Sequence, residues 1–231
     1  MINNIKNFDW KKFLQPYELA VEGFILKFEG IKKQYQLEGE YSPIEIVSGR
    51  VKSVDSILDK AKRMGVPFEY IDEELYDIGG VRITCKYIDD VYAICDLIKS
   101  RKDIKVIEIR DYIKNPKPSG YRSLHILSEY SVETIKGQIK VKLEFQIRTH
   151  AMHFWASIEH SLKYKYSKQI PDELKERLYL ASLAGAALDG EMSMIHTLIA
   201  EYDKKDKQDK QDNKTSDPLE QEVSMNTMKR W

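Results

Sequence analysis

The segment IKVKLEFQIR, residues 139–148, has the clearest strand pattern in the chain. Apolar and polar residues alternate at every position, and this period of two places them on opposite faces of a β-strand. The polar face then carries Glu144 and Gln146, while the apolar face packs on a core. A half-solvated antiparallel sheet has the same pattern, so alternation alone assigns no function to these side chains.

The segments around this strand predict a domain of mixed α and β structure. Helices precede, separate and follow the strands, and turns near residues 115–120 and 136–137 join strands as hairpins. This order favours an α+β fold with a mixed, largely antiparallel central sheet of about five strands over a doubly wound parallel sheet. The other strands are predicted at residues 44–47, 81–87, 104–109 and 124–132, and the helices at 8–36, 53–63, 89–99, 152–165 and 171–202.

The chain divides into four predicted parts. An N-terminal helical region (1–47) precedes a central domain (48–168), which is followed by a helix (169–202) and a low-complexity tail (203–231) that we expect to be disordered. Apolar residues between Leu174 and Tyr202 follow a heptad spacing. That helix is therefore expected to contact a second subunit as well as its own core.

Composition narrows the classes of protein. Lys plus Arg and Asp plus Glu both number 37, so net charge gives no general attraction to nucleic acid or to a membrane surface. The N-terminus lacks the apolar core of a secretory signal, and we expect no membrane-spanning helix, which needs about 20 apolar residues. The two cysteines, Cys85 and Cys95, exclude a disulfide scaffold and favour a cytoplasmic location.

A candidate phosphate-binding surface lies at the start of the helix predicted at residues 53–63. Short donors and cations near a helix N-terminus suit a polyphosphate, although a solvated basic face has the same pattern. The residues concerned are Arg50, Lys52, Ser56, Lys60 and Arg63.

Two carboxylates form a candidate metal site. Asp77 precedes a Gly79–Gly80 pair at the entrance of a strand, where a turn residue is the ordinary alternative. Together with Glu144 it would bind Mg²⁺ and leave coordination positions for substrate phosphates. If the predicted strands are neighbours, Arg82 and His125 share the polar face of Glu144.

Aromatic and histidine residues complete the candidates. Tyr121 follows a proline-stiffened loop and is a possible stacking platform for a purine, or an ordinary loop tyrosine. His150 and His153 are spaced three residues apart, but no HExxH spacing or nearby cysteine supports zinc catalysis.

Together these motifs resemble the synthetase domain of the RelA/SpoT family of (p)ppGpp synthetases. The likeness covers about residues 48–166 and implies a single-domain small alarmone synthetase, with a THAMHFWA segment more RelP-like than RelQ-like. The hydrolase and regulatory domains of the long relatives are not expected, since all five histidines lie at or after His125 and the sequence ends at Trp231. The segments that carry the likeness are GRVKSVDSILDK (49–60), DIGGVRI (77–83), RDYIKNPKPSGYRSLH (110–125) and LEFQIRTHAMHFWASIEHSLKYKY (143–166).

The resemblance implies an enzyme of the stringent response. The family moves the β,γ-pyrophosphoryl group of ATP to the 3′-hydroxyl of GTP or GDP and releases AMP. It implies that Asp77 and Glu144 bind Mg²⁺ and that Glu144 also acts as the base on the 3′-hydroxyl. The nucleotide contacts that it implies are Arg50 and Arg82 on the adenine, Lys52, Ser56, Lys60 and Arg63 on the ATP phosphates, Tyr121 stacked on the guanine, and Lys117, His125, Gln146 and Arg110 on the acceptor nucleotide.

One residue departs from the pattern of many relatives. His153 occupies the position of Asn in AMNFWA and would lie near the guanine, which affects acceptor preference and its pH dependence. The preference between GTP and GDP stays open.

The resemblance also bears on partners. It implies a homotetramer formed through terminal helices, with no membrane and no stable nucleic-acid partner. Two alternatives remain: a pyrophosphokinase of the same fold that modifies the 3′ end of tRNA, and a non-catalytic RNA-binding oligomer.

Overall fold

The computed structural model describes residues 8–166 and 170–215. Two compact units divide between Asp189 and Gly190. The first unit contains the sheet, and both units contribute to the last helix. In chain order the elements are α2 (Trp10–Leu37), β1 (Ile46–Val51), α3 (Val54–Met64), η1 (Phe68–Tyr70), α4 (Ile71–Glu74), β2 (Gly79–Cys85), α5 (Ile88–Ser100), β3 (Ile104–Asp111), β4 (Leu124–Thr134), β5 (Gly137–Thr149), α6 (His150–Lys165) and α7 (Asp172–Thr215).

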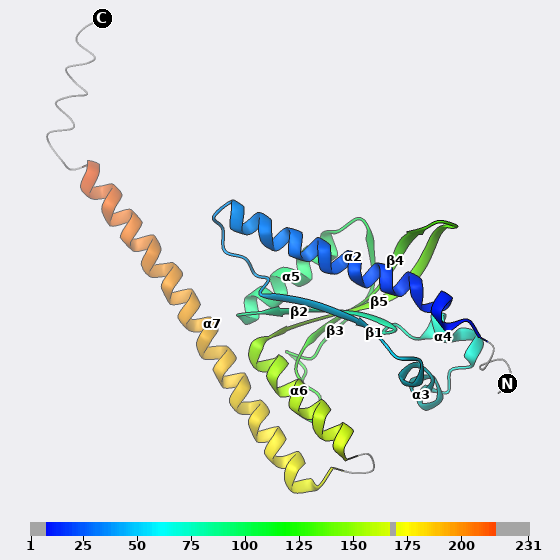
Figure 1. Cartoon of the computed structure of the whole chain (residues 1–231). Coiled ribbons are helices and arrows are strands. Elements are labelled where there is room, and N and C mark those ends of the chain that lie inside the picture. The colour runs from blue at the N-terminus through cyan, green and yellow to red at the C-terminus, as the bar shows by residue number, and fades with distance from the viewer. Residues whose placement is uncertain (1–7, 167–169, 216–231) are drawn as a thin grey trace, which may run out of the picture. The chain divides into compact units, whose positions relative to one another are not determined.

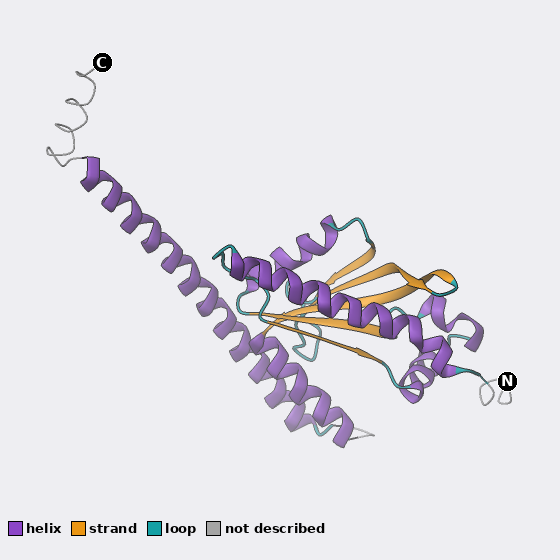
Figure 2. Ribbon diagram, turned by 45° about the horizontal axis from the view of Figure 1, so that its top comes forward, coloured by secondary structure: helices purple, strands orange, loops and turns teal. Residues whose placement is uncertain are grey.

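The five strands, drawn in orange in Figure 2, form one mixed sheet. Their order across the sheet is β1-β2-β5-β4-β3. Every neighbouring pair is antiparallel except β2 and β5, which run parallel. The chain passes from β2 to β5 through α5, β3 and the β4–β5 hairpin, and this long path allows the parallel pair. The predicted α+β fold is confirmed.

The core lies on the face of the sheet that α2 and α5 cover, and Figure 1 shows α2 running along this face. The rings of Phe24 and Phe28 on α2 are fully buried against Phe145 on β5, with centroids 5.1 and 6.1 Å away. The apolar positions of the segment 139–148 therefore face α2, and the polar positions face the opposite side.

Three local predictions differ from the structure. Strand β1 continues to Val51 through residues predicted as a loop, because Ser48–Val51 pairs with Gly79–Arg82 along β2. Pro16 predicts a break or a start within the helical segment 8–36, but it lies inside α2 without ending the helix. Burial of the Pro16 ring in the core offsets the one backbone hydrogen bond that proline cannot donate.

The third difference concerns the tail. Disorder was predicted from Asp203, but α7 continues to Thr215. The segment 203–215 contains neither Gly nor Pro, and extending an existing helix costs far less free energy than starting one. The rest of the predicted tail, 216–231, lies outside the described residues.

No helix within the described ranges is long and apolar enough to cross a membrane. Cys85 and Cys95 are both buried free thiols.

Candidate functional site

The polar face of the sheet brings predicted site residues into adjacent rows. Gln146 on β5 pairs with Arg82 on β2 and with His125 on β4. Glu144 lies two residues earlier on β5, opposite Gly80. Because directly paired residues point to the same face of a sheet, the predicted grouping of these four side chains is confirmed.

A cavity of about 200 Å³ lies on this face between β1, β2 and β5. Its wall contains three cationic side chains and both predicted metal-binding carboxylates. The predicted residues in its wall are Arg50, Lys52, Asp77, Arg82, Glu144 and Gln146.

Asp77 lies between two lysines. Its Oδ2 is 2.7 Å from Nζ of Lys52 and 2.5 Å from Nζ of Lys60 on α3. Burial raises the pKa of the Asp77 carboxyl, but the hydrogen bonds and charges of the two lysines outweigh it and hold that pKa below its usual range. Oδ1 is buried and has no hydrogen-bond partner among the described residues.

This unpartnered oxygen is what a hard cation requires. Mg²⁺ commonly takes one or two carboxylates from the protein and completes its shell with water and phosphate oxygens. Asp77 and Glu144 line the same cavity and interact electrostatically, so the two carboxylates fit that donor set.

A chain of hydrogen bonds leads from the loop before β4 to the end of β5. The hydroxyl of Tyr121 lies 2.8 Å from Nε2 of His125, and Nδ1 of His125 lies 2.7 Å from Oε1 of Glu144. Gln146 donates to Oε2 of Glu144 at 2.7 Å and accepts from Nη2 of Arg148 at 2.9 Å. Both carboxylate oxygens of Glu144 are therefore held in place.

Glu144 is only 8% exposed, yet it is ionised at neutral pH. Burial would raise the pKa of this carboxyl, but hydrogen bonds from His125 and Gln146, with the charge on His125, hold that pKa below its ordinary value. A buried, oriented carboxylate can accept a proton from a hydroxyl group placed beside it.

A second cavity, of about 420 Å³, lies between the sheet and α6. It shares Arg50, Arg82 and Gln146 with the first cavity, so the two adjoin. Tyr121 and His153, the two residues predicted to lie near the guanine, also line it. Burial, followed by the charges of Arg148 and Arg82, lowers the pKa of His153, so its imidazole is neutral at pH 7.

The loop that carries Tyr121 is fixed against the first part of α7. Gly120 has φ +89°, and a Cβ there would lie 2.2 Å from Oγ of Ser182. Arg122 donates to Asp189 at 3.2 Å, and both side chains are largely buried. Burial, outweighing the hydrogen bonds from Thr149 and Arg122, raises the pKa of Asp189.

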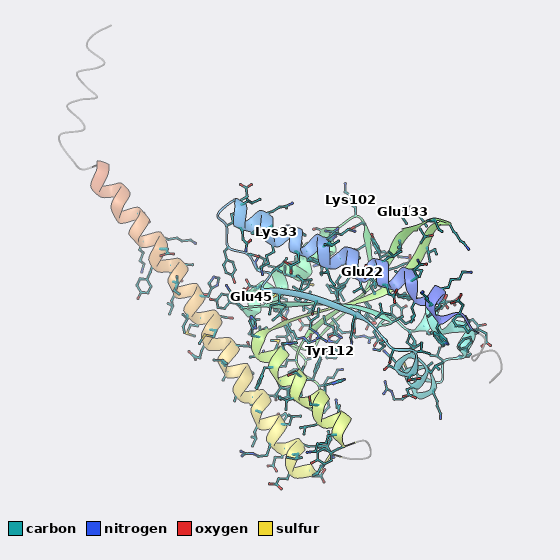
Figure 3. The ribbon with its side chains drawn as sticks, viewed as in Figure 1. Glu22, Lys33, Glu45, Lys102, Tyr112 and Glu133 are labelled. Carbon is teal, nitrogen blue, oxygen red and sulfur yellow. The ribbon has the colours of Figure 1, made fainter. Side chains whose placement is uncertain are left out.

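Lys117, in the same loop, places Nζ 4.4 Å from the ring centroid of Tyr112 and 4.9 Å from that of Tyr121. Tyr112, labelled in Figure 3, lies on the side of the sheet facing α6, with its ring 5.2 Å from that of His125. Lys117 is thus held beside the predicted stacking platform.

Six predicted residues lie outside the walls of these two cavities: Ser56, Lys60, Arg63, Arg110, Lys117 and His125. Ser56 is exposed in the first turn of α3, where its backbone N–H donates to Oγ of the N-cap residue Ser53. Arg63 is exposed in the last turn of α3. Arg110 pairs with His125 across β3 and β4 but binds Glu108 through two hydrogen bonds of 2.8 Å.

Sequence reasoning missed two features. Arg148 belongs to the same polar alternation as Glu144 and Gln146, so the pattern pointed to it without indicating its burial beneath α6. Asp189 and Ser182 left no local signal, because their partners come from a loop far away in the sequence.

A mixed sheet that gathers cations and two carboxylates around two adjoining cavities is typical of the class of nucleotide-dependent phosphate-transfer enzymes. The chain belongs to the RelA/SpoT family: residues 49–169 match the family described as the region found in RelA/SpoT proteins.

Individual relatives agree with this family. The chain is 48% identical over 192 residues to GTP pyrophosphokinase YjbM of Bacillus subtilis, covering 83% of this chain and 90% of the relative. Small alarmone synthetase 1 of Bacillus subtilis, solved with its product pppGpp, is similar with a TM-score of 0.79 at 48% identity, covering 82% and 97% of the two chains. The same synthetase bound to AMPCPP has a TM-score of 0.74 at 44% identity, covering 83% and 98%. These names do not distinguish RelP from RelQ, so the RelP-like subgroup stays a prediction.

Proposed function

We propose that this chain transfers the β,γ-pyrophosphoryl group of ATP to the 3′-hydroxyl of GTP or GDP, giving (p)ppGpp and AMP. The observation that carries the proposal is the hydrogen-bonded row Tyr121–His125–Glu144 beside the Asp77 cavity. Relatives named GTP pyrophosphokinase, and a similar synthetase solved with pppGpp, support it.

The donor half of the proposed site lies at β1, β2 and α3. We place the adenine of ATP between Arg50 and Arg82, since planar guanidiniums stack on aromatic bases. Lys52 and Lys60 would exchange part of their contact with Asp77 for the phosphates, and Ser56 and Arg63 would reach them from α3. The similar synthetase bound to AMPCPP, a methylene-bridged form of ATP, supports a nucleoside triphosphate here.

Glu144 is the proposed general base. It would take the proton of the acceptor's 3′-hydroxyl as that oxygen forms a bond to the β-phosphorus, while the bond between the β-phosphorus and the oxygen shared with the α-phosphorus breaks and AMP leaves. Such transfers depend on positioning and charge neutralisation more than on covalent catalysis, and the surrounding cations suit this requirement. Asp77 and Glu144 would hold Mg²⁺, which when bound neutralises phosphate charge.

The acceptor half is proposed at the second cavity. Tyr121 would stack on the guanine, and Lys117, His125, Gln146 and Arg110 would contact the nucleotide. His153 would lie near the base as a neutral imidazole, given the lowered pKa of this side chain.

The decisive test of the proposed reaction compares Glu144→Gln with Glu133→Gln, at the exposed end of β4. Each protein is incubated with Mg²⁺, ATP and GDP, and the products are separated by anion exchange. Wild type and Glu133→Gln should release AMP one-for-one with a guanosine tetraphosphate, while Glu144→Gln should lose at least about a hundredfold in rate. A wild-type rate in Glu144→Gln contradicts the mechanism.

Two alternative functions have their own outcomes. Label from ATP that enters bulk tRNA but not GDP would favour a tRNA-modifying pyrophosphokinase. Salt-dependent RNA binding without ATP turnover would favour a non-catalytic RNA-binding oligomer. The zero net charge argues for neither.

We further propose a homotetramer assembled through terminal helices. Large apolar side chains on α7 within the second unit, among them Met194, Leu198 and Tyr202, are exposed and suit such contacts. Light scattering that finds a monomer at micromolar concentration contradicts this.

Two further assignments are proposals. We place the enzyme in the cytoplasm, because two buried free cysteines suit a reducing compartment. We also propose a functional division into an N-terminal helical region (1–47), a synthetase domain (48–168) and an oligomerisation helix within α7 (Asp172–Thr215).

A further inference from the structure

The second cavity has an arginine that the proposed roles leave unused. Arg148, at the end of β5, lines this cavity and is 3% exposed. A guanidinium carries five N–H donors, yet the described residues accept one hydrogen bond from it, donated by Nη2 to Oε1 of Gln146. Its Nε is buried without a partner in the described part of the chain.

The side chains around Arg148 leave its guanidinium more in need of a hydrogen-bond acceptor from a ligand. Arg50 and Arg82 line the same cavity, and Nε of Arg82 also has no partner among the described residues. Burial and these neighbouring cations lower the pKa of Arg148 to about 10, so it remains charged. The carboxylate of Glu159, in the same wall, is paired with Lys163 at 2.8 Å. A buried cation in this setting is stabilised when a ligand supplies oxygen or nitrogen lone pairs.

The aromatic ring in the wall of the cavity favours a base as the ligand. Tyr121 lies in the same wall as Arg148, and the two side chains interact electrostatically. A purine stacked on Tyr121 would therefore have an edge within the reach of Arg148. Phosphates carry a shell of water and metal ions, whereas a nine-tenths buried guanidinium beside an aromatic ring suits a flat and partly apolar group.

The two common purines differ on the edge that an arginine can read. Guanine presents two acceptors, N7 and O6, which match two parallel N–H groups. Adenine presents N7 beside an amino group, which would face a donor and leave both groups unsatisfied. A wall rich in donors therefore accepts guanine and rejects adenine.

We propose that Arg148 reads the N7/O6 edge of the acceptor guanine and thereby selects guanosine over adenosine as the acceptor. This rests on the proposed function, which puts GTP or GDP in this cavity. Gln146, which accepts from Nη2, orients the guanidinium and links this recognition to Glu144.

The test uses acceptors that differ by one atom. In 7-deaza-GDP a carbon replaces N7 and O6 remains, while inosine diphosphate keeps both acceptors and lacks the 2-amino group. Wild type should show a KM about tenfold higher for 7-deaza-GDP than for GDP, as expected for half of a bidentate contact. The two KM values should be nearly equal for Arg148→Met.

Two other variants separate charge from geometry. Arg148→Lys keeps the charge but loses the planar fork, so it should not restore the difference between GDP and 7-deaza-GDP. Arg177→Met, exposed on α7, should keep the full difference. The KM for ATP should not change in the Arg148 variants, and the ratio of IDP to GDP rates should stay as in wild type.

Several outcomes overturn the inference. Equal wild-type KM values for GDP and 7-deaza-GDP do so without any variant, even if Arg148→Met fails to fold. A loss that grows from GMP through GDP to GTP would assign Arg148 to the 5′-phosphates, and a raised KM for ATP alone would assign it to the donor. If wild type makes no product from ATP and GDP, the proposed function fails instead.

Discussion

Nδ1 of His125 lies 2.7 Å from Oε1 of Glu144, and the two residues come from neighbouring strands of the same sheet. A carboxylate can only accept, so Nδ1 donates, and Nε2 lies 2.8 Å from the hydroxyl of Tyr121. His125 thereby connects the proposed stacking platform to the proposed base. The contact between His125 and Glu144 follows from the pairing of β4 with β5, which places both residues.

Removing this histidine should change the pH dependence of the reaction. His125→Ala deletes the hydrogen bond and charge that oppose the effect of burial, so the pKa of Glu144 rises. More of the base is then protonated at a given pH, and the acidic limb of the kcat profile moves to higher pH. We expect a loss of about a hundredfold at pH 7, measured as AMP release.

His125→Asn is the matched variant, since its amide can donate from nearly the position of Nδ1. It should recover part of the rate and move the acidic limb back towards that of wild type. An unchanged profile in His125→Ala would show that Glu144 needs no support from this ring.

The two lysines at Asp77 should act as a coupled pair. Lys52 and Lys60 both bind Oδ2 of Asp77, so they share one partner and are expected to share one phosphate group. Lys52→Met and Lys60→Met should each raise the KM for ATP about tenfold, and the double variant should lose less than the product of the two. Steady-state kinetics at varied ATP and saturating GDP measure this coupling, and strictly multiplicative effects would indicate independent sites.

Replacing Gly120 should damage the acceptor site specifically. Gly120→Ala combines a φ of +89° with a Cβ placed 2.2 Å from Oγ and 2.6 Å from Cβ of Ser182. We expect the free energy of unfolding to fall by about 3 kcal/mol, and the KM for GDP to rise more than the KM for ATP.

Gly137 is the control for this substitution, since its φ is +98° and no atom lies within 4 Å of its Cβ position. Gly137→Ala should cost about 1 kcal/mol and leave both KM values unchanged. Adding Ser182→Gly to Gly120→Ala should bring its stability close to that of Gly137→Ala. No recovery would mean that backbone strain, not the contact with α7, dominates.

Asp103 should support stability down to low pH. Its carboxylate lies 2.7 Å from Arg101 and 2.8 Å from Lys27. Burial raises the pKa of Asp103, but these cations outweigh it and lower the pKa to about 2. The stabilisation is therefore present above the unfolded pKa near 3.9 and is lost as the pH falls towards 2.

For Asp103→Asn we expect about 1 kcal/mol less stability at pH 7, after solvent screening of this partly exposed group, and no deficit near pH 2. Urea unfolding at both pH values measures it. Asp96→Asn, at an exposed pair with Lys99, should cost less stability than Asp103→Asn, and equal costs would contradict the role given to the ion pairs of Asp103.

Most of the sheet could be predicted because its signal is local. Alternation in residues 139–148 determined which face Glu144 occupies, and a period of two holds wherever a strand buries one side. The same reasoning failed for Ser48–Val51, because Gly49 and Arg50 interrupt the apolar alternation there. Pairing with β2 stabilises this part of the strand.

The site was predictable where strands carry it and not where the chain folds back on itself. Arg82, His125, Glu144 and Gln146 sit on strands, and their grouping needed only correct neighbours. Asp189 meets Arg122 across 67 positions of sequence, and no periodicity encodes such a contact. The burial of Arg148 likewise depends on α6 returning over the end of β5, a tertiary event without a local motif.

Gly120 and Arg122 pack against Ser182 and Asp189. The donor and acceptor halves of the proposed site therefore depend on different parts of the chain. Arg50, Lys52 and Asp77 stand on or beside the paired strands β1 and β2, whereas Tyr121 owes its position to a helix that comes far later in the chain. Damage to that later helix would therefore produce a protein that still binds ATP but no longer positions an acceptor nucleotide for the pyrophosphoryl group.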